Sequence, residues 1–196
     1  MCIDKNAFRV KVKKTRSETE NREKKDAETI TVFTDYFDKN NQFDKYLLYY
    51  PLKDEINILP LFDFLQKKNI PIYIPVSEKA SYNLTFYKYD RKSLIKGSYG
   101  ILEPDRKKCE ELTSFEDAAI IVPNLCCDKN FNRMGYGKGF YDRFLSGKDI
   151  FKIALVYEEL LFDKIPVSEY DIKMDMIITE KTKAMPLEST AKEIIF

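Results

Sequence analysis

The fold of this chain is decided by residues 118–143, AAIIVPNLCCDKNFNRMGYGKGFYDR. The first five residues of this stretch are apolar without interruption, which is typical of a parallel strand buried on both faces. Pro123 ends the strand, and a glycine-containing loop leads into a short helix predicted over residues 140–146. In an open α/β sheet, ligands bind beyond the carboxyl ends of the strands. We therefore expect the glycine loop to lie at a binding edge.

The glycine loop has the composition of an anion site. It holds three of the chain's six glycines: Gly135, Gly137 and Gly139. Alternating glycines permit positive φ angles and let backbone N–H groups approach a ligand closely. Successive exposed amides bind anions, and Arg133 and Lys138 add two cations beside them. Asp142 follows within one helical turn, where its carboxylate can hold a metal ion against the same anion. The pattern indicates a nucleotide phosphate with Mg²⁺.

The spacing of these glycines excludes two common phosphate motifs. A Walker A loop needs four residues between its first glycine and Gly-Lys-Ser/Thr, and the dinucleotide fingerprint needs a glycine where Phe140 stands. Composition and spacing alone leave a phosphate loop and a structural turn equally open.

The remaining sequence alternates between helical and strand patterns. Helices are predicted over residues 3–27, 30–37 and 57–68, the first of them mostly exposed. Strands are predicted over residues 45–50, 70–76, 83–89, 151–156 and 176–179. The alternation predicts a three-layer α/β fold, with a mainly parallel sheet, helices on both faces and a Rossmann-like topology. With 196 residues and no linker, the chain is expected to form one domain over residues 1–196.

Composition excludes several classes of function. The chain has no histidine, so it has no His-dependent triad and no histidine base. Its four cysteines show no CxxC spacing, which argues against structural zinc. The apolar runs are too short to span a bilayer, and the N-terminus has no secretory signal. A net charge of +1 gives no general attraction to nucleic acid. We expect a cytoplasmic, monomeric enzyme with no membrane or nucleic-acid partner.

Residues 122–145 closely resemble the signature of the 5-formyltetrahydrofolate cyclo-ligase family, whose members are also called methenyltetrahydrofolate synthetases. In that family a Val-Pro-Gly strand end leads to Arg-Leu-Gly-x-Gly-x-Gly-Tyr-Tyr-Asp. Weaker matches occur in the same order as in the family, at residues 5–9, 54–56, 101–104 and 165–180. The resemblance spans nearly the whole chain.

Four features depart from the family pattern. Asn124 stands where the family has glycine, and Cys126-Cys127 replaces an aromatic position. Tyr170 replaces a frequent histidine, and Ile58 replaces a threonine. None of them removes a phosphate or metal group, but Asn124 and Ile58 are expected to reshape the pterin pocket.

The resemblance implies a reaction that depends on ATP and Mg²⁺. The formyl oxygen of 5-formyltetrahydrofolate would attack the γ-phosphate of ATP and form an imidate phosphate. Nitrogen N10 would then close the ring, and loss of phosphate would leave 5,10-methenyltetrahydrofolate. The protein's task would be to position the reactants and stabilise charge, which requires no histidine.

The resemblance also assigns residues to roles. Arg133 and Lys138 would be catalytic. ATP would contact the following residues: Lys5, Arg9, Arg133, Met134, Gly135, Tyr136, Gly137, Lys138, Gly139, Phe140 and Tyr141. The folate would contact a second, overlapping set: Tyr50, Glu55, Tyr136, Gly137, Lys138, Gly139 and Phe140. Asp142 and Asp175 would bind Mg²⁺.

Two alternatives stay open. Asn124 and Ile58 leave room for a paralogue of the same fold that uses ATP on a different substrate. The basic segment from Lys5 to Arg16, with the many Tyr and Phe residues, leaves room for a module that binds single-stranded RNA. The second alternative requires aromatic side chains outside the core.

Overall fold

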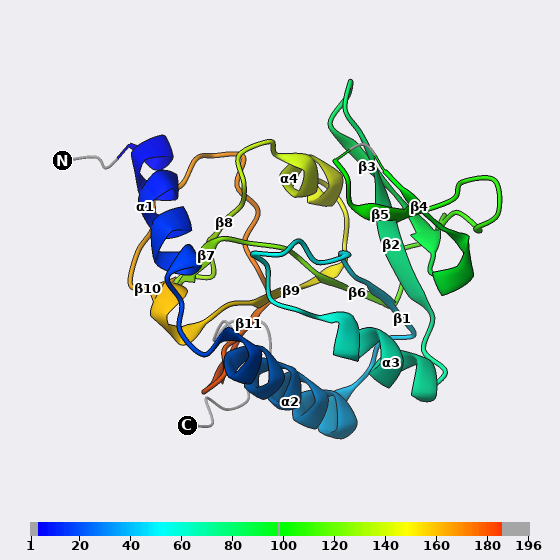
Figure 1. The fold of residues 1–196 in the computed structure, drawn as a ribbon, viewed down its shortest axis with the longest axis horizontal. Helices are drawn as coiled ribbons and strands as arrows, with labels where there is room; N and C mark the ends of the chain where they lie inside the picture. Colours follow the sequence, from blue (N-terminus) through cyan, green and yellow to red (C-terminus); the bar gives the residue numbers. More distant parts are fainter. Residues whose placement is uncertain (1–3, 98, 186–196) are drawn as a thin grey trace.

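A seven-stranded sheet forms the centre of the molecule in a computed structural model, which describes residues 4–97 and 99–185 (Figure 1). Its strands in chain order are β1 (Lys45–Leu47), β2 (Ile72–Glu78), β3 (Asn83–Lys88), β6 (Ala118–Ile121), β9 (Phe151–Leu155), β11 (Met176–Ile178) and β12 (Lys183–Ala184). Their order across the sheet is β12-β11-β9-β6-β1-β2-β3. The five central strands are parallel, and the edge strands β12 and β3 are antiparallel to their neighbours. The prediction of a mainly parallel α/β sheet is confirmed.

Four helices cover the sheet: α1 (Lys5–Ser17), α2 (Arg22–Asn40), α3 (Leu59–Lys67) and α4 (Phe140–Leu145). Helices α2 and α3 lie together on one side of the sheet, whereas α1 and α4 lie on the other side (Figure 1). Two single 3₁₀ turns, η1 (Arg91–Ser93) and η2 (Glu158–Leu160), connect strands. The helices give the predicted three layers. No helix within the described ranges is long and apolar enough to cross a membrane.

The single helix predicted over residues 3–27 is wrong. The chain forms α1 and α2 there, separated at Asn21, whose φ of 53° is left-handed and cannot continue a right-handed helix. Helix α1 begins after Asp4, whose carboxylate accepts a hydrogen bond from the amide of Ala7 at 2.9 Å. Most residues of α1 are exposed, as predicted, but Phe8, Val12 and Arg16 are buried at four-residue spacing. This stripe attaches α1 to the body of the protein and brings its basic residues close to the glycine loop.

Two small sheets were not predicted. One contains β7 (Cys126–Asp128), β8 (Arg133–Met134) and β10 (Leu161–Phe162), and the other contains β4 (Leu94–Lys96) and β5 (Leu102–Pro104). Each strand has only two or three residues, too few to show a period of two in the sequence. These short strands place side chains precisely: β8 holds Arg133, and β5 holds Glu103.

The continuous apolar run of β6 is buried along its whole length, as predicted. It lies between β1 and β9 in the middle of the sheet. After Pro123 the chain forms β7 and β8 and then the glycine loop, which α4 follows. The loop therefore follows the carboxyl end of a central strand, where ligands bind in parallel α/β sheets.

Candidate functional site

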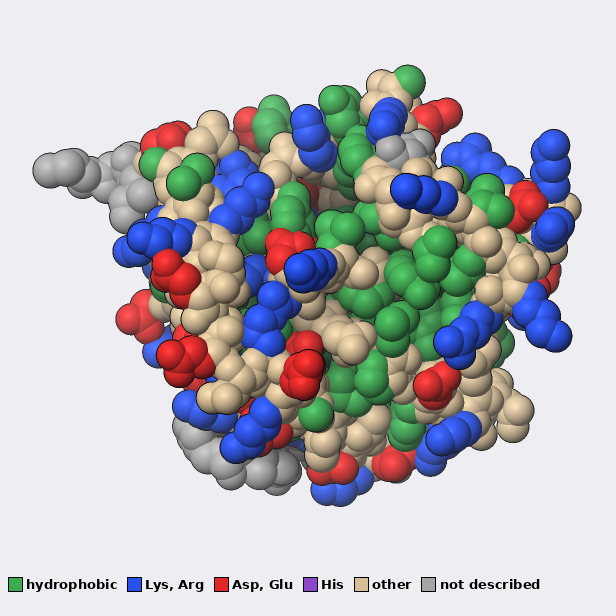
Figure 2. Space-filling view, in the orientation of Figure 1, with side chains coloured by type: hydrophobic (Ala, Val, Ile, Leu, Met, Phe, Trp, Pro, Cys, Tyr) green, Lys and Arg blue, Asp and Glu red, His purple; other side chains and the backbone are tan. Residues whose placement is uncertain are grey.

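A cleft of about 940 Å³ lies at this end of the sheet. Most of the predicted site residues line it: Lys5, Arg9, Tyr50, Glu55, Arg133, Gly135, Tyr136, Gly137, Lys138, Gly139, Phe140, Tyr141 and Asp142. On the face seen in Figure 2, Lys and Arg side chains gather over α1 beside a broad band of hydrophobic side chains. The cleft therefore joins a basic wall to an apolar one.

The glycines of the loop are required by conformation and by space. Gly137 and Gly139 have φ angles of 101° and 69°, which side chains with a Cβ rarely adopt. A Cβ on Gly135 would lie 2.7 Å from Nη1 of Arg133, and one on Gly137 would lie 3.2 Å from Cζ of Arg9. Arg9 also donates from Nε to the carbonyl of Gly135 at 3.1 Å. The loop is thus shaped to bring two guanidinium groups against its backbone.

Arg133 is a buried cation at the base of the loop. Its side chain is only 3% exposed. Nη1 donates to the carbonyl of Pro123 at 3.1 Å, and Nη2 donates to Oδ1 of Asp142 at 2.7 Å. Its Nε is buried and has no partner among the described residues. Arg133 therefore links the end of β6 to α4 and places a fixed positive charge under the loop.

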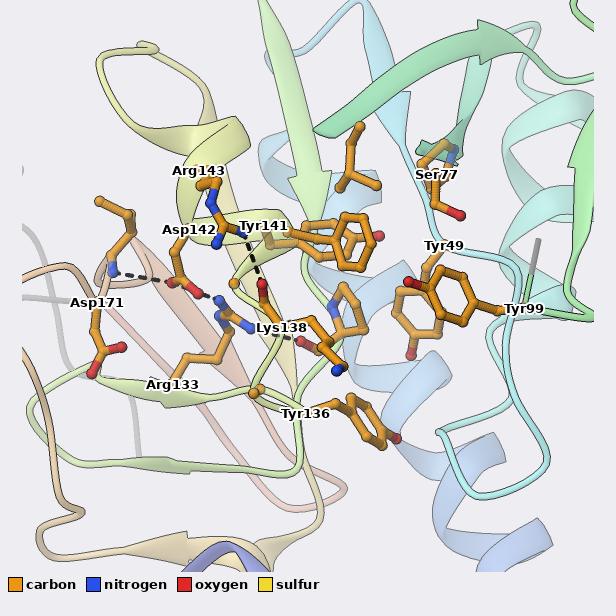
Figure 3. A pocket seen from close by; sticks show the side chains of 18 of the residues that line it. Tyr49, Ser77, Tyr99, Arg133, Tyr136, Lys138, Tyr141, Asp142, Arg143 and Asp171 are labelled. Carbon is orange, nitrogen blue, oxygen red and sulfur yellow. Dashed lines mark hydrogen bonds and ion pairs between the residues drawn. The ribbon is translucent and has the colours of Figure 1, made fainter. Parts of the chain in front are cut away.

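Asp171 is a site residue that the sequence did not reveal. It lines the cleft and receives hydrogen bonds from Nζ of Lys5, at 2.6 Å to Oδ1, and from the amide of Ser168, at 2.7 Å. Burial opposes ionisation of this carboxyl, but the hydrogen bonds from Lys5 and Ser168 outweigh it and lower the pKa of Asp171. The amide of Ile172 points to Asp142 Oδ1 at 3.4 Å. Asp142 and Asp171 lie on the same side of the cleft (Figure 3).

Asp175 does not line the cleft. It directly precedes β11 and therefore lies at the amino end of a parallel strand, away from the edge that carries the loop. Its Oδ2 accepts from the amide of Lys152 at 2.7 Å and pairs with Nζ of the same residue at 2.6 Å. Its predicted role as a metal ligand gains no support from this position.

The carboxylates beside the loop suit Mg²⁺. No group of three His, Cys, Asp or Glu side chains that could hold a metal exists among the described residues. Mg²⁺ in nucleotide sites is commonly bound by one or two carboxylates together with substrate phosphates. Asp142 and Asp171 fit that donor set, because both face the cleft next to the glycine loop.

Lys138 is the exposed cation of the loop. It forms no ion pair with any described residue, and its Nζ lies 5.9 Å from the ring centroid of Tyr82. Its carbonyl accepts from Nη1 of Arg143 at 2.8 Å, which fixes the backbone and leaves the ammonium group free (Figure 3). Met134 precedes this region but is fully buried in β8 and does not line the cleft, so its predicted contact with ATP gains no support.

Glu55 and Tyr50, the two predicted folate residues outside the glycine loop, also line the cleft. Glu55 is 7% exposed, and its Oε2 accepts from the amide of Leu52 at 2.8 Å. Burial raises the pKa of Glu55, although the hydrogen bond from Leu52 and the charge of Arg16 oppose the shift. Tyr50 lines the cleft, and its ring packs on Phe62 at 6.3 Å between centroids.

A second buried carboxylate, Glu103, was also missed. It is 6% exposed, lies on β5 and lines the cleft. Its Oε1 accepts from the hydroxyl of Ser77 at 2.6 Å and from the amide of Ser77 at 3.2 Å. The only signal in the sequence was the match at residues 101–104, which gave Glu103 no role.

Two of the departures from the family pattern, Asn124 and Ile58, lie outside the lining of the cleft. Asn124 is buried, and its side-chain amide donates to the carbonyls of Leu155 at 2.9 Å and Val122 at 3.3 Å. Ile58 is completely buried in the core. Neither side chain lines the cleft, because both are used to join elements beneath it. Tyr170 does line the cleft rim and is 75% exposed.

Comparisons with known proteins identify the family of this chain. The model of the 5-formyltetrahydrofolate cyclo-ligase family matches residues 3–180. A 5-formyltetrahydrofolate cyclo-ligase of Mycolicibacterium smegmatis is 30% identical over 139 residues, covering 68% of this chain and 72% of that protein. One of Escherichia coli (strain K12) is 30% identical over 130 residues, covering 64% and 71%. The solved 5,10-methenyltetrahydrofolate synthetase of Aquifex aeolicus is 27% identical, with a TM-score of 0.79 and 96% of each chain covered. The chain therefore belongs to the 5-formyltetrahydrofolate cyclo-ligase family.

Proposed function

We propose that this protein uses ATP and Mg²⁺ to convert 5-formyltetrahydrofolate into 5,10-methenyltetrahydrofolate, with release of ADP and phosphate. The proposal rests on one observation: two chemically different surfaces line the same cleft. A glycine loop with Arg133 and Lys138 suits a triphosphate, and the adjoining apolar wall suits a flat ring. At about 940 Å³, the cleft has the volume of a large ligand pocket.

The phosphate end supplies positioning and charge. The exposed amides around Gly137 and Gly139 and the ammonium group of Lys138 meet the oxygens of the transferred phosphoryl group, where negative charge develops. Lys5 and Arg9 reach the same space from α1. Groups held in place before the reaction stabilise the transition state without further reorganisation.

The reaction then has two steps. The formyl oxygen attacks the γ-phosphorus, the bond to the β–γ bridging oxygen breaks, and ADP leaves while an imidate phosphate forms. N10 next attacks the formyl carbon, the carbon–oxygen bond to phosphate breaks, and the N10 proton passes to the departing phosphate. Neither step needs a histidine, and the cleft achieves both by holding the reacting atoms close together.

Asp142 and Asp171 would hold Mg²⁺, which when bound neutralises charge on the phosphate oxygens. In the structure these carboxylates pair with Arg133 and Lys5. Binding of the metal nucleotide would therefore exchange partners: the carboxylates would move to the metal and the cations to the phosphates.

The observations that motivated the two alternative functions do not extend to the cleft or to the exposed surface. The paralogue interpretation rested on Asn124 and Ile58, and neither lines the cleft. The RNA interpretation needs exposed aromatic rings, but Tyr99 and Tyr170 are the only strongly exposed aromatic side chains among residues 4–97 and 99–185.

The test is a spectrophotometric assay of purified protein with 5-formyltetrahydrofolate and MgATP, following the near-ultraviolet band of the methenyl product. We expect the band to grow only when ATP and Mg²⁺ are both present. Lys138→Ala should lower turnover by about 10²-fold, as expected for a lost transition-state donor. Lys79→Ala is the matched control, because Lys79 also lies over a tyrosine ring, 5.0 Å from that of Tyr99, but does not line the cleft. No product from folded wild-type protein that binds ATP would overturn the proposal.

A further inference from the structure

Glu103 is a buried carboxylate whose charge is not neutralised by any cationic side chain among residues 4–97 and 99–185. It forms no ion pair with any residue in the described ranges. Its hydrogen-bond donors in the structure are the hydroxyl and amide of Ser77, both bound to Oε1. Glutamate side chains are rarely buried without a partner, because removing a charge from water is costly unless donors or cations replace the water. A buried carboxylate with one oxygen held by Ser77, and the other without a donor among the described residues, points to a ligand.

The position of Glu103 is fixed by its surroundings. A Cβ on Gly97 would lie 2.2 Å from both Cδ and Oε2 of Glu103, so a side chain there would collide with the carboxylate. Ser77 holds it from β2, and β2 and β5 pack together. Neither Glu103 nor Ser77 belongs to the glycine loop. The geometry is that of a preformed acceptor, since the side chain does not need to be ordered when a ligand arrives.

The chemistry of the surroundings narrows the ligand. The neighbouring cleft residues are apolar or aromatic: Pro75, Leu84, Tyr99, Ile101 and Leu102. Ser77 and Tyr99 lie on the opposite side of the cleft from Arg133 and Asp171 (Figure 3). An ionised carboxylate only accepts hydrogen bonds, so its partner must carry N–H or O–H donors. An apolar wall with one acceptor suits a flat heterocycle that presents an N–H edge.

We propose that Glu103 recognises the pyrimidine edge of the reduced pterin ring, accepting hydrogen bonds from its 2-amino group and the adjacent ring N–H. The inference rests on the proposed function and adds a specificity-determining residue to it. It also sets the direction of the substrate in the cleft: the pyrimidine edge lies against β5, and the formyl group points toward the glycine loop. Ser77 acts as a positioning residue that orients the carboxylate.

Glu103→Gln tests the inference, because glutamine keeps the shape but offers an amide N–H₂ group where the ring also presents donors. The dissociation constant of 5-formyltetrahydrofolate, measured without nucleotide, should rise about 10-fold or more, as for a lost charged hydrogen bond. The KM for MgATP should stay unchanged. Glu116→Gln, an exposed carboxylate outside the cleft, is the matched control and should change neither value.

A substrate analogue without the 2-amino group separates recognition from a structural role. Wild-type protein should bind this analogue about 10-fold more weakly than 5-formyltetrahydrofolate, whereas Glu103→Gln should bind both alike. If the variant weakens both ligands equally, or neither, the inference is wrong. A wild-type protein that binds 5-formyltetrahydrofolate without converting it would overturn the proposed reaction but leave this test intact. Ser77→Ala should weaken binding less, because the carboxylate remains.

Discussion

The carboxylates at the two ends of the cleft have different kinds of partner. At the phosphate end each carboxylate has a cation: Asp142 pairs with Arg133 at 2.7 Å, and Asp171 pairs with Lys5. The opposite end, beside β5, is the one proposed to hold the pterin ring and is called the ring end. Its carboxylate Glu103, like Glu55 elsewhere in the cleft, is more than nine-tenths buried and accepts hydrogen bonds from neutral donors, with no ion pair to any described residue. The phosphate end therefore holds paired charges of both signs, whereas the ring end holds a carboxylate that can accept hydrogen bonds.

The difference fits two kinds of ligand. A metal nucleotide brings anions and a cation together, so it can replace both partners of each ion pair without leaving a buried charge alone. A pterin ring brings neutral N–H donors, and a preformed acceptor is enough to bind them. Changes at the phosphate end should therefore affect turnover and the use of MgATP, whereas changes at the ring end should affect the folate and leave the nucleotide alone.

Arg133→Ala is expected to have the largest effect. The change removes a cation beneath the loop, and turnover should fall at least about 10²-fold. It also leaves Asp142 without its partner, and breaking a buried pair commonly costs about 3 kcal/mol of unfolding free energy. Steady-state kinetics and denaturant unfolding measure the two effects.

Arg133→Lys separates the effect on turnover from the effect on stability. Lysine keeps the charge but cannot reach the carbonyl of Pro123 and Asp142 with the planar geometry of the guanidinium group. We expect most of the stability to return and turnover to remain low. Near-normal turnover in Arg133→Ala would remove this residue from the machinery and leave it as a structural link between β6 and α4.

Asp171→Asn and Asp175→Asn should affect different properties of the protein. Asp171→Asn removes a candidate metal ligand from the cleft, and the KM for MgATP should rise about 10-fold, as for a lost charged interaction. Asp175→Asn should leave that KM unchanged and lower only stability, because Asp175 pairs with Lys152 outside the cleft. Titration of Mg²⁺ at fixed ATP checks both variants. A larger effect in Asp175→Asn would restore Asp175 as the metal ligand.

The ends of the cleft also differ in how far the sequence reveals them. The sequence predicts a phosphate site at the glycine-loop end because the key groups there are contiguous, from Arg133 to Asp142, and glycine spacing carries a direct physical meaning. Even there, Asp171 was missed, because its closeness to Asp142 depends on a loop with no sequence period. At the ring end, Ser77 and Glu103 come from separate strands, one of only three residues. No local pattern connects them, so their contact emerges only from the packing of β2 against β5.

The central strands could be predicted for a related reason. A strand buried on both faces, such as β6, is marked by an unbroken apolar run that needs no tertiary information. The break between α1 and α2 carried no such mark, because Asn21 adopts a left-handed conformation in a stretch of polar residues that also suit a helix. Local patterns identify what is buried, whereas breaks and contacts between distant segments depend on the whole fold.

Glu55→Gln should have the smallest effect of these variants. It should raise the stability of the fold, whereas the variants at the phosphate end should lower it. Burial raises the pKa of Glu55 in the folded protein, so the folded state retains its proton more strongly than the unfolded chain. Stability therefore falls as the pH rises from the unfolded pKa, about 4.3, through the raised folded value. Glutamine cannot ionise but keeps an oxygen for the amide of Leu52. At pH 7.5 the variant should unfold at a higher temperature than the wild type.

The pH dependence distinguishes this explanation from a general change in packing. The gain in the Glu55→Gln variant should shrink as the pH falls toward 5, because the raised pKa lets the wild-type carboxyl take up its proton at a higher pH in the folded protein than in the unfolded chain. Asp171→Asn should behave in the opposite way: the lowered pKa of Asp171 stabilises the fold above the unfolded pKa, so the variant should unfold at a lower temperature than wild type at pH 7.5. Thermal unfolding of both variants at the two pH values makes the comparison. If both variants shifted in the same direction at pH 7.5, the two ends would not differ in how they hold their carboxylates.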